Sequence, residues 1–345
     1  MLNIYTLDNM EQWDNVVRCF SAYDVYYLSG YVKGFWEHGD GEPILLHYCS
    51  EILEGINVVM KRKIANDSHF AGKISDDYCD LISPYGYGGW LIQGNGEIDP
   101  LMEEYDEWCR KNNIVSEFVR FHPLLKNHEV LAKYYNVESP GSTISMNLAS
   151  KQTIWGDLTS KNRNMVRKAQ KNGLKVFRSS GPEIYAAFQK IYNQTMDKDH
   201  AASYYYFKPT YYQSVREYLN NNAQVFYAQT EDGTIAAAAI ILGANGRLNY
   251  HLSGSRQELQ RLAPTNLLLY NAACWGYENG YKSFHLGGGI GAKEDSLYAF
   301  KKAFCRQDPH PFYIGKRIIS QEVYHMLLNL RDRPVVGEFF PAYRA

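Results

Sequence analysis

Several features that mark other protein classes are missing from this sequence of 345 residues. Its first residues, MLNIYTLDNMEQW, lack the charged head and apolar run of a signal peptide. No apolar stretch is long enough to span a bilayer. The six cysteines are widely scattered and form no CxxC or Cys/His metal spacing, which predicts reduced thiols. We therefore expect a cytoplasmic protein that holds no metal and no resident cofactor.

An excess of charge of one sign is also missing. The chain has 36 Lys and Arg against 37 Asp and Glu, for a net charge of -1, so any basic binding site must be local. No GxSxG motif is present, and no cysteine has a histidine and an acid as its immediate neighbours in the sequence. His122, His251 and His285 fall at or in predicted strands, where a structural role is the common one. Direct attack in a ternary complex therefore fits this chain better than a covalent intermediate.

The length exceeds one typical core and predicts two domains. Residues 100–121 and 264–286 share one order: proline, a helix with tryptophan and cysteine, an Asn- or Gly-rich stop, and a strand. Each follows a strand–turn–strand segment, which indicates a diverged duplication. The alternative is two unrelated domains built from the same common elements. We predict a mixed α/β (α+β) fold with domains at 1–150 and 151–345.

Hairpin signals indicate that the sheet of each half is mostly antiparallel. Residues 43–49 and 55–62 are predicted to pair as neighbouring strands, and so are residues 224–229 and 234–242. The second pair is joined by a turn at Glu231-Asp232-Gly233. Helices before and after these strands are expected to cover the two sheets.

The stretch 281–306, YKSFHLGGGIGAKEDSLYAFKKAFCR, reads as a strand, a glycine loop and a helix. Gly287–Ala292 fits a weak dinucleotide-binding pattern, but the next strand, near 311–315, lacks the acid that this pattern needs. No Gly-Lys-Ser/Thr follows, so the loop is not a P-loop. The loop, with Gly288 and Gly289, either holds a phosphate or a developing oxyanion or is only a tight turn.

The helix after the loop carries the candidate catalytic residue. Each residue advances by ~100° around a helix, so Leu297, Phe300 and Phe304 are predicted to share one face. Lys301 then lies at the margin of that face, and Lys302 points toward water. Lys301 is the candidate for stabilising a developing charge; the alternative is that its stem merely covers apolar surface.

A local basic segment lies between Asp157 and Glu183, within a long helix predicted at 154–171 and the strand after it. It contains no acid and seven basic residues: Lys161, Arg163, Arg167, Lys168, Lys171, Lys175 and Arg178. Arg163, Arg167 and Lys171 recur every four residues and share a face. This face either binds a polyanion, such as phosphates or an RNA backbone, or is an ordinary solvated face.

Tyrosine is unusually frequent, with 29 residues. Tyrosines offer large flat surfaces with a polar handle, which suit a long groove, or they are half-buried core. The first half concentrates aromatic residues in three places, each with candidate binding residues. These are DVYYLSGYVKGFW with Lys33, SPYGYGGWLI with Tyr85 and Tyr87, and the strand end with Arg120 and His122.

An ordered set of motifs resembles the Fem-type (FemABX) aminoacyltransferases. Pro84 to Gly89, PYGYGG, is similar to a stretch of that family, and Arg120-Phe121-His122-Pro123 to its strand end. Ser160-Lys161-Asn162-Arg163 through Ala169 resembles its basic helix. Leu286-Gly287-Gly288, with Leu297 and Phe300-Lys301-x-x-Phe304, resembles its C-terminal signature. These blocks fall in the family's order and cover most of the chain.

The resemblance implies two tandem GNAT-like domains and transfer of an acyl or aminoacyl group to an amine. The family's donor is typically aminoacyl-tRNA, and its acceptor is a cell-wall precursor peptide on a nucleotide or lipid diphosphate, with peripheral contact to the inner membrane face. Lys301 matches the lysine near the reacting ester. The first domain, with Lys33, Tyr85, Tyr87, Arg120 and His122, is expected to bind the acceptor, and the second the donor, through Arg163, Arg167, Lys171, Gly288 and Gly289. No helical arm for tRNA is present.

Two alternatives to this function stay open. GNAT proteins that use acyl-CoA hold its pyrophosphate in an Arg/Gln-x-x-Gly-x-Gly/Ala loop before a helix. The corresponding segment here, SRQELQRLA at 255–263, contains no glycine, which argues against CoA because backbone amides are poorly provided. An acyl-CoA-dependent transferase acting on a surface glycan is nevertheless one alternative. The other is a non-catalytic module that binds precursors.

Overall fold

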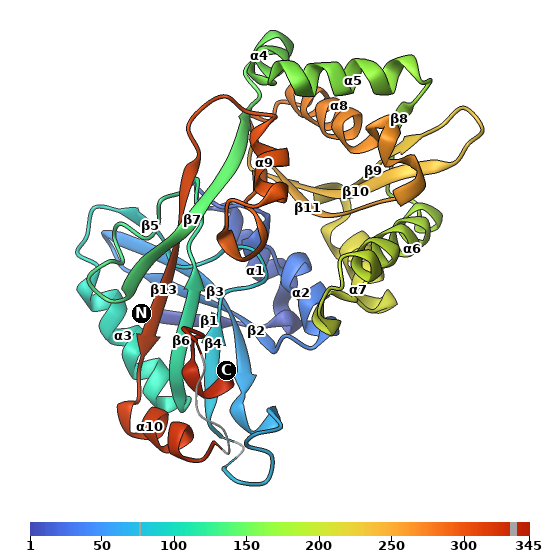
Figure 1. Ribbon diagram of the computed structural model, residues 1–345. Coiled ribbons are helices and arrows are strands. Elements are labelled where there is room, and N and C mark those ends of the chain that lie inside the picture. The colour runs from blue at the N-terminus through green and yellow to red at the C-terminus, as the bar shows by residue number, and fades with distance from the viewer. Residues whose placement is uncertain (76, 332–336) are drawn as a thin grey trace. The chain divides into compact units, whose positions relative to one another are not determined.

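The computed structural model describes residues 1–75, 77–331 and 337–345. The chain forms two compact units, one of residues 1–140 with 312–345 and the other of residues 141–311. Each unit is a mixed, mostly antiparallel sheet flanked by helices (Figure 1). No helix of the described residues is long and apolar enough to cross a membrane.

The first unit contains the predicted hairpin within a larger sheet. The strands are β1 Leu2–Tyr5, β2 Glu42–Cys49, β3 Leu53–Lys63, β4 Cys79–Ile82, β5 Leu91–Gly94, β6 Ile114–Arg120 and β13 His310–Ile318. The helices are α1 Met10–Arg18, α2 Ser29–His38, α3 Asp99–Lys111 and α10 Gln321–Asn329. The sheet runs β1-β2-β3-β4-β6-β13, with β5 on β3. β2 and β3 pair antiparallel, as predicted, whereas β4 and β6 are parallel.

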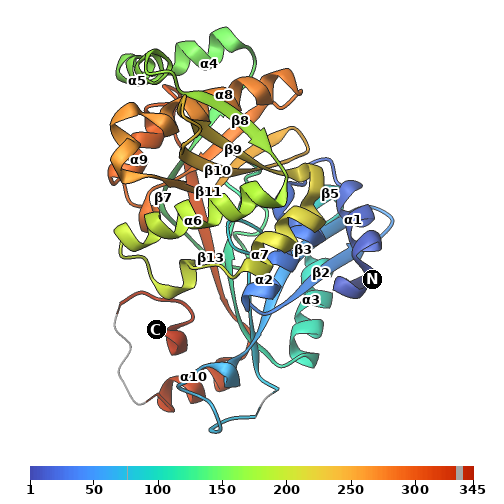
Figure 2. The same ribbon diagram turned by 90° about the vertical axis from the view of Figure 1, so that its right-hand side faces the viewer.

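The second unit repeats this arrangement. Its strands are β7 Asn136–Asn147, β8 Lys175–Ser179, β9 Ala223–Gln229, β10 Ile235–Ala244, β11 Arg247–Ser255 and β12 Ser283–Gly287. Its helices are α4 Lys151–Asp157, α5 Ser160–Lys171, α6 Pro182–Lys198, α7 Pro209–Ser214, α8 Pro264–Glu278 and α9 Ser296–Lys302. The sheet runs β8-β9-β10-β11-β12-β7, and α6 and α8 cover opposite faces of it (Figure 2).

Among the described residues, each unit contains one parallel pair of strands joined through a helix. In the first unit α3 precedes β6, which pairs with β4, and in the second α8 joins β11 to its partner β12. These are the two segments whose similar order suggested a duplication. Beyond this pair, β13 pairs antiparallel with β6 in the first unit, and β7 pairs antiparallel with β12 in the second. Both β13 and β7 come from another part of the chain.

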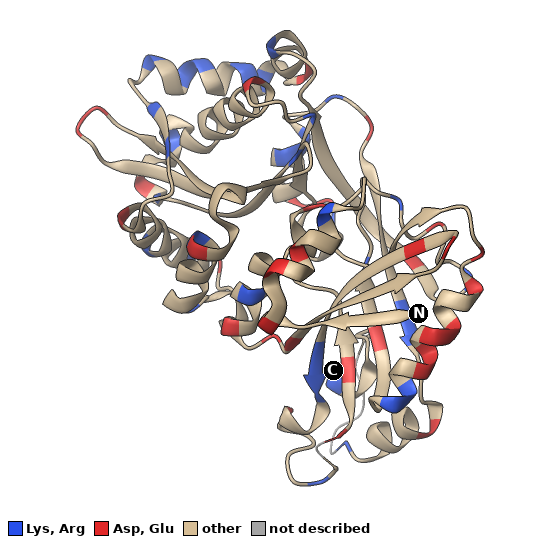
Figure 3. Ribbon diagram, turned by 180° about the vertical axis from the view of Figure 1, so that it is seen from behind, with Lys and Arg blue, Asp and Glu red and all other residues tan. Residues whose placement is uncertain are grey.

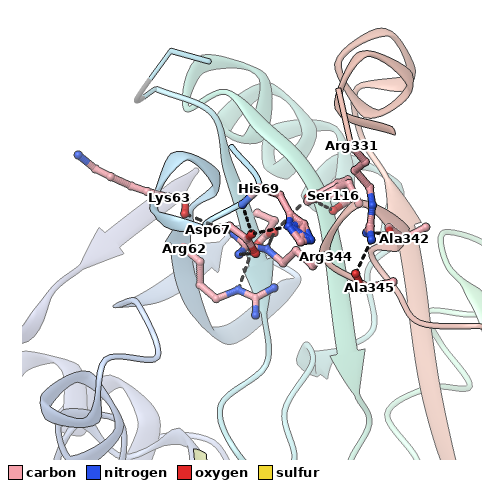
Figure 4. A network of polar contacts seen from close by, with 11 residues as sticks. Arg62, Lys63, Asp67, His69, Ser116, Arg331, Ala342, Arg344 and Ala345 are labelled. Atoms are coloured by element: carbon pink, nitrogen blue, oxygen red, sulfur yellow. Dashed lines mark hydrogen bonds and ion pairs between the residues drawn. The ribbon is translucent and has the colours of Figure 1, made fainter. Parts of the chain in front are cut away.

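The C-terminal segment packs with the first unit, so the units do not divide the chain at residue 150. Ile314–Ile318 of β13 pairs with Ser116–Arg120 of β6. Figure 4 shows Arg344 among Arg62, Lys63 and Asp67 of the same unit. The Tyr343 hydroxyl donates to the fully buried Asp80 at 3.1 Å. A long-range polar network therefore holds the segment, which no local sequence pattern could indicate.

Two predicted helices differ in detail from those of the structure. The single helix expected at 154–171 is two helices, because Leu158 is extended and the Thr159 side chain caps α5 by accepting the Asn162 N–H at 3.2 Å. α9 is short, and Phe304 lies beyond its end. Leu297 is 37% exposed, so the predicted apolar face is only partly correct.

Candidate functional site

The parallel strands β11 and β12 separate inside the second unit. They pair only over Arg247–Asn249 and Ser283–His285, although β11 continues to Ser255. The register of β11 against β10 jumps from Leu252 to Tyr250, which leaves His251 as an extra residue. Such a bulge bends its strand. β11 therefore leaves β12 at the end of the sheet where β12 enters the glycine loop.

The glycine loop is tightly packed. Gly287 has a φ of +78°, and a Cβ on Gly288 would lie 2.8 Å from the Ser142 carbonyl oxygen. A Cβ on Gly289 would lie 2.0 Å from the Lys293 carbonyl oxygen. Glycine is thus needed for the turn itself. A donor-binding role for Gly288 and Gly289 remains a prediction.

Lys301 leans over this loop, as its helical position predicts. Its side chain is 9% exposed, and Nζ donates to the Gly288 carbonyl oxygen at 2.6 Å. Nζ lies 6.0 Å from the centre of the Tyr250 ring on β11. Burial lowers the pKa of the Lys301 ammonium to about 8, and Asp295 opposes the shift. Lys302 is only partly exposed and donates to the Gln307 carbonyl oxygen.

The position of α9 is set by polar contacts that the sequence did not reveal. Asp295 caps the helix by accepting the Tyr298 N–H at 2.8 Å and also accepts the Ile290 N–H at 3.0 Å. At the other end the Ala303 carbonyl oxygen accepts from Thr159 N–H at 2.9 Å and from the Asn162 side chain at 3.2 Å. Asn162 is 1% exposed. Through its hydrogen bond to Ala303 it connects α5 to the end of the helix that carries Lys301.

The three basic residues predicted to share one face of α5 do not have equivalent surroundings. The Arg163 guanidinium donates to the carbonyl oxygens of Trp155, Gly156 and Leu158 at 3.5, 3.3 and 2.9 Å. It therefore supplies hydrogen-bond donors to the carbonyl groups at the end of α4. Arg167 and Lys171 are exposed, together with Lys161 and Lys168. Figure 3 shows Lys and Arg along α5.

In the first unit the tyrosine-rich loop is shaped by two glycines. Gly86 has a φ of +94°, and a Cβ on it would lie 2.6 Å from the Tyr26 ring. Gly89 has a φ of +88°, and a Cβ on it would lie 2.9 Å from the Phe121 ring. Tyr85 stacks on Phe35 of α2 at 5.2 Å. These close approaches fix a half-buried aromatic surface.

His122 lies beneath this aromatic surface. It is fully buried, and its Nδ1 accepts the Leu124 N–H at 3.2 Å. The ring proton therefore lies on Nε2, which donates to the buried Asp24 carboxylate at 3.0 Å. The His122 ring is 5.6 Å from the Tyr87 ring and 5.8 Å from that of Tyr26. Because it has no exposed surface, we propose that His122 supports the tyrosines instead of contacting an acceptor.

The remaining candidates of the first unit are partly exposed. Burial raises the pKa of the Tyr87 hydroxyl, and Arg120 opposes that shift. The Arg120 guanidinium lies 5.1 Å over Phe118. Lys33 lies 5.3 Å over Trp36 on α2. The structure thus brings together Tyr87 and His122. It also packs Tyr85 against α2, the helix that carries Lys33. The residues that sequence reasoning missed here are Asp24 and Tyr26.

A comparison with protein families finds a match inside the second unit. Residues 160–302 match the model of an acetyltransferase (GNAT) domain family. No curated protein sequence matches the chain.

Solved structures match over nearly the whole chain. FemX is 13% identical with a TM-score of 0.69, covering 94% of this chain and 99% of its own. The DUF2156 domain of a putative lysylphosphatidylglycerol synthetase from Agrobacterium fabrum is 16% identical, with a TM-score of 0.55 and coverages of 90% and 92%. A tandem GNAT protein from the clavulanic acid biosynthesis pathway is 9% identical, with a TM-score of 0.50 and coverages of 93% and 100%. The chain therefore has a tandem GNAT-like fold similar to that of FemX, and the match to the acetyltransferase (GNAT) domain model lies within its second unit.

Proposed function

We propose that the protein is an N-acyltransferase that moves an aminoacyl group from aminoacyl-tRNA to an amine of a cell-wall precursor. The observation that carries this proposal is Lys301, a buried ammonium beside the glycine loop where β11 leaves β12. A preorganised cation in a site poor in water stabilises a developing oxyanion strongly.

The reaction needs little chemistry from the protein. The acceptor nitrogen attacks the ester carbonyl, the carbonyl oxygen gains negative charge, and the C–O bond to the tRNA ribose breaks as the amide forms. The Lys301 ammonium stabilises that oxygen or an adjacent phosphate. The amine loses one proton and the departing ribose hydroxyl gains one, and substrate-assisted transfer supplies this step.

Two features of the second unit favour tRNA over CoA as the donor. The exposed basic residues of α5 offer several phosphate contacts. The segment before α8 folds into a 3-10 helix, Gln257–Leu262, in which the Leu259 and Ala263 amides donate to the carbonyls of Arg256 and Gln260. Those two amides are therefore engaged, which disfavours a pyrophosphate cradle in this segment.

The acceptor is assigned to the first unit. Tyr85 and Tyr87 offer flat faces with hydroxyls, and Arg120 and Lys33 offer cations for a diphosphate. A carrier lipid on that diphosphate would bring peripheral contact with the inner membrane face. This assignment rests on the partly exposed aromatic surface above His122 and on the resemblance to Fem-type enzymes.

An acyl-CoA donor is the second candidate, because the family model that matches residues 160–302 is that of an acetyltransferase domain. A transfer assay separates the two donors. Mixed aminoacyl-tRNAs and a panel of acyl-CoAs, each with a labelled acyl group, are incubated with amine-bearing precursors. We expect label on the precursor from tRNA and none from CoA. Transfer from acyl-CoA alone would refute the tRNA assignment. If no label is transferred from either donor, the result would favour a non-catalytic binding module.

The basic face of α5 predicts salt-dependent tRNA binding. Arg167→Gln combined with Lys171→Gln removes two exposed cations and should reduce the slope of log affinity against log salt by roughly 1 to 2. Fluorescence anisotropy with deacylated tRNA across salt concentrations measures this slope. Lys198→Gln on α6, an exposed lysine paired with Asp199, is the matched control. Arg163 is left intact because it donates to carbonyl groups at the end of α4. A slope unchanged from that of the wild type would show that the basic face of α5 is an ordinary solvated face.

A further inference from the structure

The two separated strands of the second unit lead into different helices. β11 leads through Gln257–Leu262 into α8, whereas β12 leads through the glycine loop into α9, which carries Lys301. The pairing of β11 with β12 ends at Asn249 and His285. The position of Lys301 relative to α8 therefore depends on contacts other than this strand pair.

Asn162, on the first turn of α5, contacts both of these helices. Its Nδ2 donates to the Ala303 carbonyl oxygen at 3.2 Å, and its Oδ1 accepts from the Asn266 side chain at 2.7 Å. Ala303 directly follows α9, and Asn266 lies in the first turn of α8. One amide therefore links the start of the helix after β11 to the end of the helix after β12.

The chemistry of its partners fixes the orientation of this amide. A backbone carbonyl only accepts hydrogen bonds, so the Nδ2 of Asn162 has to face Ala303. Its Oδ1 then faces Asn266, which presents its own amide nitrogen as the donor. Asn162 is shielded from water because it is buried. A buried polar group that loses its partner is costly, so the link favours one arrangement of the three helices.

Lys301 depends on the end of α9 that this amide holds. It lies two positions before Ala303, and its Nζ donates to the Gly288 carbonyl oxygen. α9 comprises only Ser296–Lys302, and a helix this short is held in place mainly by its packing and end contacts. A misplacement of about 1 Å can cost a reacting group much of its effect. The hydrogen bond from Asn162 therefore bears directly on where the ammonium lies.

We propose that Asn162 is a positioning residue for Lys301, whose amide holds α8 and α9 together so that the ammonium stays beside the glycine loop. This role rests on the proposed function, in which that ammonium stabilises the charge of the reacting ester. Asn162 belongs to the helix with the exposed cations Lys161 and Arg167, but it is itself buried. It acts through Lys301 and not through contact with the donor.

Asn162→Ala removes both side-chain links and tests this role. The Ala303 carbonyl oxygen keeps the Thr159 N–H at 2.9 Å, so we expect the fold to persist. With the donor and acceptor identified by the transfer assay, kcat should fall roughly tenfold or more, whereas KM for the donor should change little. Asn266→Ala removes only one of the links and should lower kcat less. It carries the comparison if Asn162→Ala does not fold.

A second measurement follows Lys301 without any substrate. Competitive labelling of lysines with acetic anhydride, read by mass spectrometry across a pH series, gives the titration of each amine. Burial lowers the pKa of the Lys301 ammonium to about 8, Asp295 opposes the shift, and the Tyr250 ring lies 6.0 Å from Nζ. In Asn162→Ala water should reach the ammonium, and its pKa should rise toward the usual range of lysine.

Asn172→Ala is the matched control for both measurements. Asn172 directly follows α5, and its side chain donates to the Lys168 carbonyl oxygen of the same helix at 2.7 Å. The substitution therefore removes an asparagine hydrogen bond of α5 that reaches neither α8 nor α9. It should leave kcat and the titration of Lys301 as they are in the wild type.

The outcomes separate this proposal from the proposed function. Wild-type kcat and a wild-type titration of Lys301 in folded Asn162→Ala would overturn the positioning role even if aminoacyl transfer is found. A lower melting temperature with both readouts unchanged would overturn it too, because the amide would then serve stability alone. A shifted titration in Asn162→Ala, when the wild type transfers no acyl group from either donor, would support the link to Lys301 and refute the proposed reaction.

Discussion

Lys301→Ala is expected to lower turnover about 100-fold or more while leaving the fold intact. This is the scale of losing one preorganised donor to a developing oxyanion. Lys301 is the buried ammonium that donates to the Gly288 carbonyl oxygen at 2.6 Å beside the separated strands. Initial rates with the donor and acceptor identified by the transfer assay, at saturating donor, measure the loss.

Two control variants separate chemistry from packing. Lys301→Met keeps the apolar stem and removes the charge, so it should lose as much activity as Lys301→Ala if the ammonium is needed. If the stem merely covers apolar surface, Lys301→Met keeps full activity and the catalytic assignment is wrong. Lys302→Ala, at the neighbouring partly exposed position, should change turnover little. Thermal melts of all three variants exclude unfolding as the cause.

The pH profile gives the protonation state in which Lys301 acts. Its pKa of about 8 means that the ammonium is present below pH 8 and is lost as the pH rises through that value. An oxyanion-stabilising role therefore predicts that kcat falls above about pH 8, and that this fall is missing in Lys301→Met. A rate that rises through pH 8 would indicate instead that the neutral amine acts as a base.

Elements set by neighbouring residues could be predicted from the sequence. The hairpins β2–β3 and β9–β10, and the two helices that precede β6 and β12, follow from turn residues, helix starts and alternation along the strands. Lys301 is buried, as its predicted position at the margin of an apolar face indicated.

Features that depend on residues far apart in the chain could not be predicted. The pair of Asp24 and His122 joins residues 98 positions apart, and the bond from Tyr343 to Asp80 spans 263. The return of β13 to the first unit could not be predicted either, because the residue pattern of a strand does not indicate which strand it pairs with. The contacts of Arg163 could not be predicted for a local reason: the break at Leu158 leaves carbonyl groups at the end of α4 to which the guanidinium donates.

Asp24→Ala is expected to destabilise the first unit by about 2–4 kcal/mol. The substitution leaves the fully buried His122 N–H without its acceptor, which costs about 1–3 kcal/mol. It also removes the carboxylate oxygen that accepts the Val25 N–H at 2.6 Å, a cap worth ~1 kcal/mol. Chemical unfolding followed by circular dichroism should show the midpoint shifting to lower denaturant.

The control for this change is Asp8→Ala, which removes an exposed acid of the same unit that accepts from Thr6. Surface changes of that kind usually stay within about 0.5 kcal/mol. Equal midpoints for Asp24→Ala and Asp8→Ala would show that the buried pair contributes nothing to the fold. If the pair does hold Tyr26 and Tyr87 in place, folded Asp24→Ala should bind the acceptor more weakly and the donor unchanged, because α5 and Lys301 belong to the other unit.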